Sequence, residues 1–273
     1  MFSEKCFRPS LRLAAACSVF LMASCSVKED RQECPCFLTL DFGEVETAAL
    51  MQKGFHDLEV FLSGNDGFTV EESWPLSEFV GEYCILVPKT GVDIMAVCHV
   101  GGSCSSTDGF RIDDGEECPA IYMYSEHFHP AGGEERIQVN LHRNYCNLSV
   151  RMKTMYDVPA RPFRVKVVGK VDGYLLGGAP REGAFSYFSA PSSEGFCRCR
   201  IPRQKDGSLM LEIDFLDSGE VRTFPAGEYI LASGYDWNSI DLEDILVEMD
   251  FSRTGVTFNI SKWKKTLSFD ITF

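Results

Sequence analysis

The sequence predicts an all-β protein built from antiparallel β-sandwiches. Nearly every readable segment alternates apolar and polar residues with a period of two, and Gly-, Asn- and Asp-rich stretches separate these segments. Such alternation is typical of strands with one buried face, and such stretches are typical of turns. Because 45% of the residues are apolar and 12% are aromatic, the chain can also bury a sizeable core.

The expected strands cover most of the chain after residue 36. The first, residues 37–42, places Leu38, Leu40 and Phe42 on one face, as the two-residue period of a strand requires. The others are expected at residues 58–62, 83–87, 92–100, 136–142, 146–152, 163–171, 209–215, 228–233, 245–251, 256–260 and 267–273. Turns are expected at residues 63–67, 172–173, 206–207 and 217–219.

A few segments depart from the strand pattern. Residues 47–53 are expected to form one or two helical turns, because a run of helix-favouring residues begins at Ala48. Residues 242–249 fit the apolar spacing of a helix as well as that of a strand, and they are interpreted as a short turn that enters a strand. Residues 101–118, rich in Gly, Ser and Asp, are expected to form a surface loop. No long helix is expected.

The chain length favours two domains over one. About 240 residues remain after the N-terminal segment, which suits two sandwiches better than a single one. We place the N-terminal β-sandwich at residues 37–142 and the C-terminal β-sandwich at residues 143–273, because two strand-like runs meet near residue 143. A hairpin within a single sheet is the alternative at this position.

The first residues have the layout of a cleaved lipoprotein signal. Basic residues precede an apolar stretch that ends in small residues and is too short to span a bilayer. The sequence LMASC at residues 21–25 is similar to the lipobox of signal peptidase II. We therefore expect residues 1–24 to be a signal peptide, cleaved between Ser24 and Cys25, with Cys25 carrying palmitate or another fatty acid. An ordinary secretory peptide is the alternative.

Residues 25–36 are expected to form a lipidated tether. Its charged tract at residues 28–30 resembles the export tag of surface-displayed lipoproteins, which favours an outward-facing place in the cell outer membrane. Loss of residues 1–24 removes three basic residues and one acidic residue, so the net charge changes from −14 to −16. Because this surface repels nucleic acid and anionic headgroups, the lipid is the only expected membrane attachment.

Nine of the twelve cysteines remain once the signal segment and Cys25 are set aside. Thiols can pair in an exported protein, but an odd number leaves at least one without a partner in the chain. We expect small buried core residues together with some disulfides. The Cys-x-Cys pairs lack zinc-site spacing, and His127 and His129 are interpreted as polar loop residues, so no metal site is predicted.

The chain is predicted not to be an enzyme. It contains no nucleophile-elbow, phosphate-loop or zinc-protease motif, and its adjacent acid pairs are interpreted as solvated surface. Trp74, Trp237 and Trp263 could form a sugar-binding platform, but well-separated tryptophans are more often core or interface residues. No cofactor and no small-molecule substrate are therefore expected.

Several segments, in this order, resemble one family. They are Cys25 with residues 27–30 and 33–35, residues 136–143, residues 234–237, and Trp263 with residues 267–273. Together they look like the FimB-type minor fimbrial subunit (anchor) family of Bacteroidetes type V fimbriae, although this chain has more cysteines than the family leads us to expect. The resemblance implies two transthyretin-like antiparallel β-sandwiches. It also implies a cell-adhesion role, in which the protein anchors a fimbria to the outer membrane and limits its length.

The resemblance further implies contact with fimbrial shaft or accessory subunits by strand pairing. The closing run places alternate apolar side chains on one face, a pattern suited to lying in a groove. The candidate subunit-contact residues are Leu267, Phe269, Ile271 and Phe273. Completion of the chain's own C-terminal sandwich is the alternative.

The distribution of arginine fits an anchor. None occurs between Arg31 and Arg111, so an arginine-specific protease cannot separate the lipid end from the first strand, whereas shaft subunits of such fimbriae are cut there. The alternative function is that of a surface glycan-binding lipoprotein of the starch-utilisation type, for which exposed, coplanar tryptophans are expected. A lipid-anchored glycosidase would need two carboxylates about 5 to 9.5 Å apart.

Overall fold

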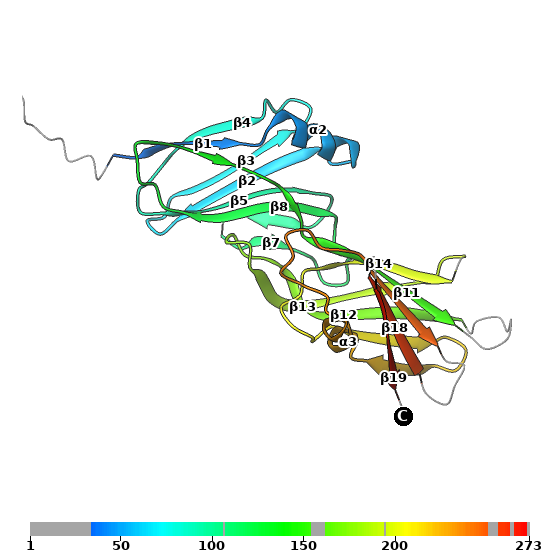
Figure 1. Cartoon of the computed structure of the whole chain (residues 1–273). Coiled ribbons are helices and arrows are strands. Elements are labelled where there is room, and N and C mark those ends of the chain that lie inside the picture. Colours follow the sequence, from blue (N-terminus) through cyan, green and yellow to red (C-terminus); the bar gives the residue numbers. More distant parts are fainter. Residues whose placement is uncertain are drawn as a thin grey trace, which may run out of the picture. The chain divides into compact units, whose positions relative to one another are not determined.

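The computed structural model describes residues 34–105, 107–153, 162–193, 195–250, 256–262 and 265–271. These residues form mostly strands, with two short helices, α2 (Glu44–Gln52) and α3 (Ala226–Ala232) (Figure 1). The predicted all-β class is confirmed, and the longer of the two described helices has nine residues. No helix in the described part of the chain is long and apolar enough to cross a membrane.

The first half of the chain forms two sheets that lie face to face (Figure 1). The three-stranded sheet has the order β4 (Glu82–Val87), β1 (Cys36–Asp41) and β9 (Glu134–Gln138). In it, β1 pairs antiparallel with β4 and parallel with β9. The five-stranded sheet is antiparallel, in the order β10 (His142–Arg143), β8 (Ile121–Phe128), β5 (Val92–His99), β2 (Asp57–Gly64) and β3 (Thr69–Pro75).

Alternate side chains of these two sheets fill the space between them. Leu38 and Leu40 of β1 and Leu62 of β2 are fully buried, as expected for the inward positions of a strand. Phe42 belongs to the same cluster and meets Phe79 edge to face, with 5.1 Å between the ring centroids. Burial stabilises the fold by about 1.5 to 3 kcal/mol for each large apolar side chain, so this cluster holds the two sheets together.

The second half of the chain also forms two sheets. One has the order β14 (Phe196–Pro202), β11 (Tyr145–Lys153), β17 (Ile245–Asp250), β18 (Val256–Lys262) and β19 (Lys265–Ile271). The other has the order β16 (Glu220–Phe224), β15 (Met210–Phe215), β12 (Phe163–Tyr174), β7 (Gly109–Arg111) and β6 (Ser103–Ser105), and β13 (Pro180–Ser189) also pairs with β12. Pairing is antiparallel except between β11 and β17, which run parallel.

The two halves repeat one strand topology. In each, the first strand (β1 or β11) has an antiparallel neighbour (β4 or β14) and a parallel neighbour (β9 or β17). In each, the second strand (β2 or β12) lies between two antiparallel partners. The correspondence ends at β17, which carries the β18–β19 hairpin, while β9 has no described strand at that position. Among the described strand pairs, β1–β9 and β11–β17 are the two that depart from the expected antiparallel pairing.

The prediction of a surface loop at residues 101–118 is wrong. Part of this segment forms the β6–β7 hairpin, which pairs with β12 of the second half, and Phe110 and Cys118 are fully buried. Gly109 permits the approach, because its φ is +74° and a Cβ atom there would lie 2.2 Å from the Tyr174 carbonyl oxygen. The glycine that looked like a loop signal instead allows two backbones to cross closely.

The prediction of a strand at residues 228–233 is also wrong, because this segment belongs to α3. Pro225 precedes the helix, and Gly234, with a φ of 77°, follows it, as is typical of helix starts and stops. Ala226 and Ile230, one helical turn apart, are both buried, so a helical face replaces the alternation of a strand. The helical turns expected at residues 47–53 are confirmed by α2.

One buried cluster links the two halves. Met95 and Met123, on the face of the first-half sheet that points away from β1, belong to the same cluster as Phe110 and the second-half core. By their contacts, residues Pro35–Phe273 form one compact unit. The predicted domain boundary between residues 142 and 143 stays a prediction.

Buried polar groups at this link are satisfied by one another. The hydroxyl of Tyr174 donates to the carbonyl oxygen of Asn144 and accepts the backbone N–H of Arg203 at 2.8 Å. The Arg203 guanidinium in turn donates to the carbonyl oxygens of Trp237 and Ser239. Because an unsatisfied buried group costs about 1 to 3 kcal/mol, this network fixes the segments that leave each sheet.

Candidate functional site

The structure describes only part of the predicted site. Ser24, Cys25 and Phe273 lie outside the described residues. Within β19, the backbone register pairs Leu267 with Ile260, Phe269 with Phe258 and Ile271 with Val256, all in β18. The predicted contact strand thus pairs with β18 of the same chain. This pairing agrees with the alternative that the closing run completes its own C-terminal sandwich.

β19 is the last strand in its sheet order, so only one of its two backbone edges is paired among the described residues. Ser268, near its middle, is exposed. An unpaired edge presents N–H and C=O groups that can pair with another chain. The strand can therefore complete its own sheet and still offer a contact edge to a partner.

Among the described strands β9 supplies a second open edge, which we call the β9 edge. The Gly133 carbonyl oxygen accepts a hydrogen bond from the Phe37 N–H of β1 at 2.9 Å, and the Val139 N–H donates to the Asp41 carbonyl oxygen at 2.7 Å. Because backbone direction alternates along a strand, the odd-numbered residues face β1. The residues whose backbone groups face the open side are Glu134, Arg136 and Gln138.

The residue pattern of β9 does not mark this strand as an open edge, because the charged residues of β9 resemble a solvated face. The signal lies in the topology: the equivalent side of β17 is occupied by β18, which runs antiparallel to it. The topology therefore marks a position that no described strand occupies, which the residue pattern does not reveal.

The Arg136 side chain links β9 to the other two strands of its sheet. Its guanidinium donates to the Asp41 carboxylate of β1 at 2.8 Å and also to Glu82 of β4. The hydrogen bond from Arg136 is the main cause that holds the pKa of Asp41 below its usual value. Exposed ion pairs contribute little stability, so this contact adds only slightly to the backbone pairing that holds β9 beside β1.

An open hollow of about 350 Å³ lies between β3 and β4. Its walls include Trp74, Phe79 and Tyr83, with acidic side chains from both strands. The Trp74 and Tyr83 ring planes are inclined by 53° with centroids 4.7 Å apart, so they form no flat platform. Of the other tryptophans, Trp237 is only 4% exposed, and Trp263 lies outside the described residues.

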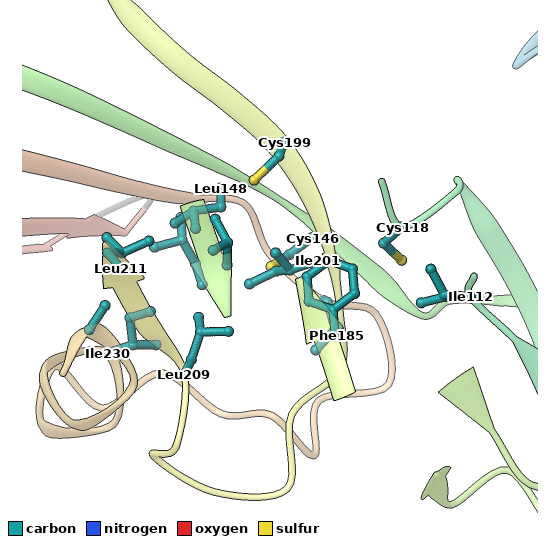
Figure 2. Packing of buried hydrophobic residues seen from close by; sticks show 14 of the residues in the cluster. Ile112, Cys118, Cys146, Leu148, Phe185, Cys199, Ile201, Leu209, Leu211 and Ile230 are labelled. Carbon is teal, nitrogen blue, oxygen red and sulfur yellow. The ribbon is translucent and has the colours of Figure 1, made fainter. Parts of the chain in front are cut away.

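None of the nine cysteines in the described part of the chain forms a disulfide, so the disulfides expected among them are not present. Figure 2 shows Cys118, Cys146 and Cys199 among apolar side chains of the second-half core. Burial raises the pKa of Cys146 to about 12 and that of Cys118 well above the ordinary value. These thiols thus act as small uncharged core residues, which confirms that part of the cysteine prediction.

No protein-family model matches the sequence, and no curated protein sequence matches it. The solved structures that share its fold include fimbrial and adhesin-like proteins. The fimbrial anchor protein Mfa2 from Porphyromonas gingivalis aligns over 88% of this chain and 99% of its own, with a TM-score of 0.59 and 11% identity.

Two Bacteroides proteins are similar to the chain at the same level. A candidate adhesin from Bacteroides ovatus aligns over 87% of this chain and 96% of its own, with a TM-score of 0.57 and 10% identity. A candidate polysaccharide-binding protein from Bacteroides thetaiotaomicron aligns over 84% of this chain and 99% of its own, with a TM-score of 0.56 and 11% identity. At such identities the likeness establishes the fold, and at that level the predicted resemblance to fimbrial subunits is confirmed.

Proposed function

We propose that this protein is a surface-exposed outer-membrane lipoprotein, acylated at Cys25, that anchors a fimbria and contacts shaft or accessory subunits by strand pairing. The observation that carries the proposal is the likeness of nearly the whole chain to a fimbrial anchor protein. In this proposal the protein performs no catalysis, and its membrane attachment is the lipid alone.

The β9 edge is the proposed acceptor of a partner strand. Backbone hydrogen bonds supply affinity in such contacts, and alternate side chains supply specificity. Because β18 pairs antiparallel with β17 at the equivalent position, a partner strand would run antiparallel to β9. The open edge of β19, the strand that carries Leu267, Phe269 and Ile271, is the second proposed contact, and Phe273, outside the described residues, belongs to the same proposed set.

We also propose that residues 37–142 and 143–273 are two transthyretin-like sandwiches. The shared topology of the two halves supports this, because a strand order repeated along one chain is expected of two copies of one fold. The β6–β7 hairpin is then an extension of the first sandwich that pairs with the second.

Glycan binding is the second candidate function. The likeness to a candidate polysaccharide-binding protein favours it, and the hollow beside Trp74 offers aromatic rings and acids. Against it stand the burial of Trp237 and the inclination of Trp74 to Tyr83, since sugar rings stack on exposed, flat aromatic surfaces. The anchor proposal is therefore preferred.

The test of strand pairing is to remove one hydrogen-bond donor from the β9 edge. Gln138→Pro deletes a backbone N–H that faces the open side, and an edge strand tolerates proline. We expect bacteria that carry this variant to keep markedly fewer fimbriae on their cells, measured as the ratio of cell-bound to released shaft subunit.

Gln138→Ala is the matched control. It also loses the contact of the Gln138 amide with the Asp41 carbonyl oxygen, but it keeps the backbone donor, so fimbriae should stay on the cells. Thermal unfolding of both purified variants checks that the fold is intact. Normal retention of fimbriae by a folded Gln138→Pro protein would exclude the β9 edge as the contact.

A further inference from the structure

Two histidines meet at the end of β8. The Nε2 atoms of His127 and His129 lie 2.9 Å apart, and their rings are nearly perpendicular, at 82°. Glu126 precedes His127 in the sequence, and its carboxylate accepts a hydrogen bond from the Tyr124 hydroxyl. The sheet register, however, places Asp93 of β5 opposite His127, with Asp93 Oδ1 2.7 Å from His127 Nδ1.

Asp93 determines which nitrogen of His127 is free. Its carboxylate accepts the proton of Nδ1, so the lone pair of His127 lies at Nε2, on the side of His129. Histidines that bind metal ions usually donate their other ring N–H to a carboxylate, which fixes the tautomer and the ring orientation. Asp93 therefore has the position of an orienting residue and not of a ligand.

Gly91 makes room for the second ring. Its φ is +97°, and a Cβ atom there would lie 2.6 Å from Cε1 of His129. The His129 imidazole thus lies directly against the backbone of the turn before β5. The His127 side chain is 49% exposed, so an ion can reach the pair from solvent.

The separation of the two nitrogens suits ligands at a right angle around one ion. With metal–nitrogen bonds of about 2.0 to 2.1 Å, two ligands at 90° lie about 2.8 to 3.0 Å apart, whereas tetrahedral ligands lie about 3.3 to 3.4 Å apart. Tetragonal or octahedral ions such as Ni²⁺ and Cu²⁺ therefore fit the observed 2.9 Å better than tetrahedral Zn²⁺ does.

We propose that His127 and His129 bind one divalent transition-metal ion through their Nε2 atoms, with Asp93 as the positioning residue. The ion takes the place of the proton between the two nitrogens, and His129 takes up a proton at Nδ1 in exchange for the one lost from Nε2, so both ligands are neutral imidazoles. Within the described residues no cluster of three or more potential metal ligands occurs, so water completes the coordination. The proposal does not depend on the fimbrial function.

The test is calorimetric titration of the untagged, reduced whole chain with NiCl₂, since Ni²⁺ fits the geometry and does not oxidise thiols. We expect one Ni²⁺ per chain at this pair. His127→Ala and His129→Ala should each weaken its binding at least 10-fold, and Asp93→Asn should weaken it by about 10- to 100-fold.

His142→Ala is the matched control, because His142 is a similarly exposed histidine that also lies beside an aspartate, Asp241. It should bind Ni²⁺ like the unchanged protein. Equal Ni²⁺ affinity in the unchanged protein and both histidine-pair variants would overturn the proposal. Loss of all Ni²⁺ binding on replacing the exposed Cys34 and Cys84 by serine would also overturn it, because thiols would then be the ligands.

Discussion

Cys146 lies in β11, fully buried in the second-half core. Burial raises the pKa of its thiol to about 12, whereas an exposed thiol titrates near 8.5. Because the folded pKa is the higher one, the thiol's contribution to stability is complete below the unfolded pKa. It is lost as the pH rises toward the folded pKa, because the unfolded thiol then ionises first.

Stability should therefore fall between about pH 9 and pH 11, with Cys146 contributing up to about 1.4 kcal/mol per pH unit. We expect urea unfolding to show a shallower fall for Cys146→Ala. Cys84→Ala, at an exposed position, should keep the slope of the unchanged protein. Equal slopes for the unchanged protein and Cys146→Ala would show that this thiol is not held neutral by the fold.

At the residue scale, the sequence predicts the burial of single side chains more accurately than it predicts contacts between side chains. Leu38, Leu40 and Phe42 are predicted to share one face, and all three are buried. The contact of Asp93 with His127 joins positions 34 residues apart and depends on the pairing of β5 with β8. Periodicity within one strand carries no information about that pairing.

At the element scale, Gly109 controls the docking of the β6–β7 hairpin on β12. Gly109→Ala combines a positive φ with a Cβ atom 2.2 Å from a carbonyl oxygen, so we expect it to lower the free energy of unfolding by at least about 2 kcal/mol. Gly115→Ala is the matched control, because Gly115 has a φ of +82° and open space around it.

Gly115→Ala should lower the free energy of unfolding by only about 1 kcal/mol, because it introduces backbone strain alone. Urea denaturation of the two variants measures the difference. If both substitutions cost the same, the close crossing of β7 and β12 does not contribute to stability.

Most of the predicted strands have a buried face, although β8 and β14, which also bury alternate residues, are not predicted. Central strands such as β2, β5 and β12 show apolar alternation and are predicted nearly to their ends. β3 and β16 are missed, because these outer strands are rich in exposed polar residues, which blunt sheet edges against aggregation. The turn expected at residues 172–173 lies within β12, where Gly173 permits close approach of β7.

At the scale of the whole molecule, the repeated topology suggests how the protein could grip a partner. The second half fills the position beside β17 with its own hairpin, whereas no described strand of the first half lies at the position beside β9. No local sequence pattern marks an empty position, so it emerges only from comparing the two halves. The lipid predicted at Cys25 would hold that open edge at the cell surface.

The most direct test of the anchor proposal is the location of fimbriae in bacteria whose only copy of this protein carries Cys25→Ala. If the lipid holds the filament to the cell, intact fimbriae should be released, and sedimentation should recover most shaft subunit from the culture medium. Fimbriae that stay on the cells in normal number, accompanied by a loss of polysaccharide binding, would contradict the anchor proposal and favour the glycan-binding alternative.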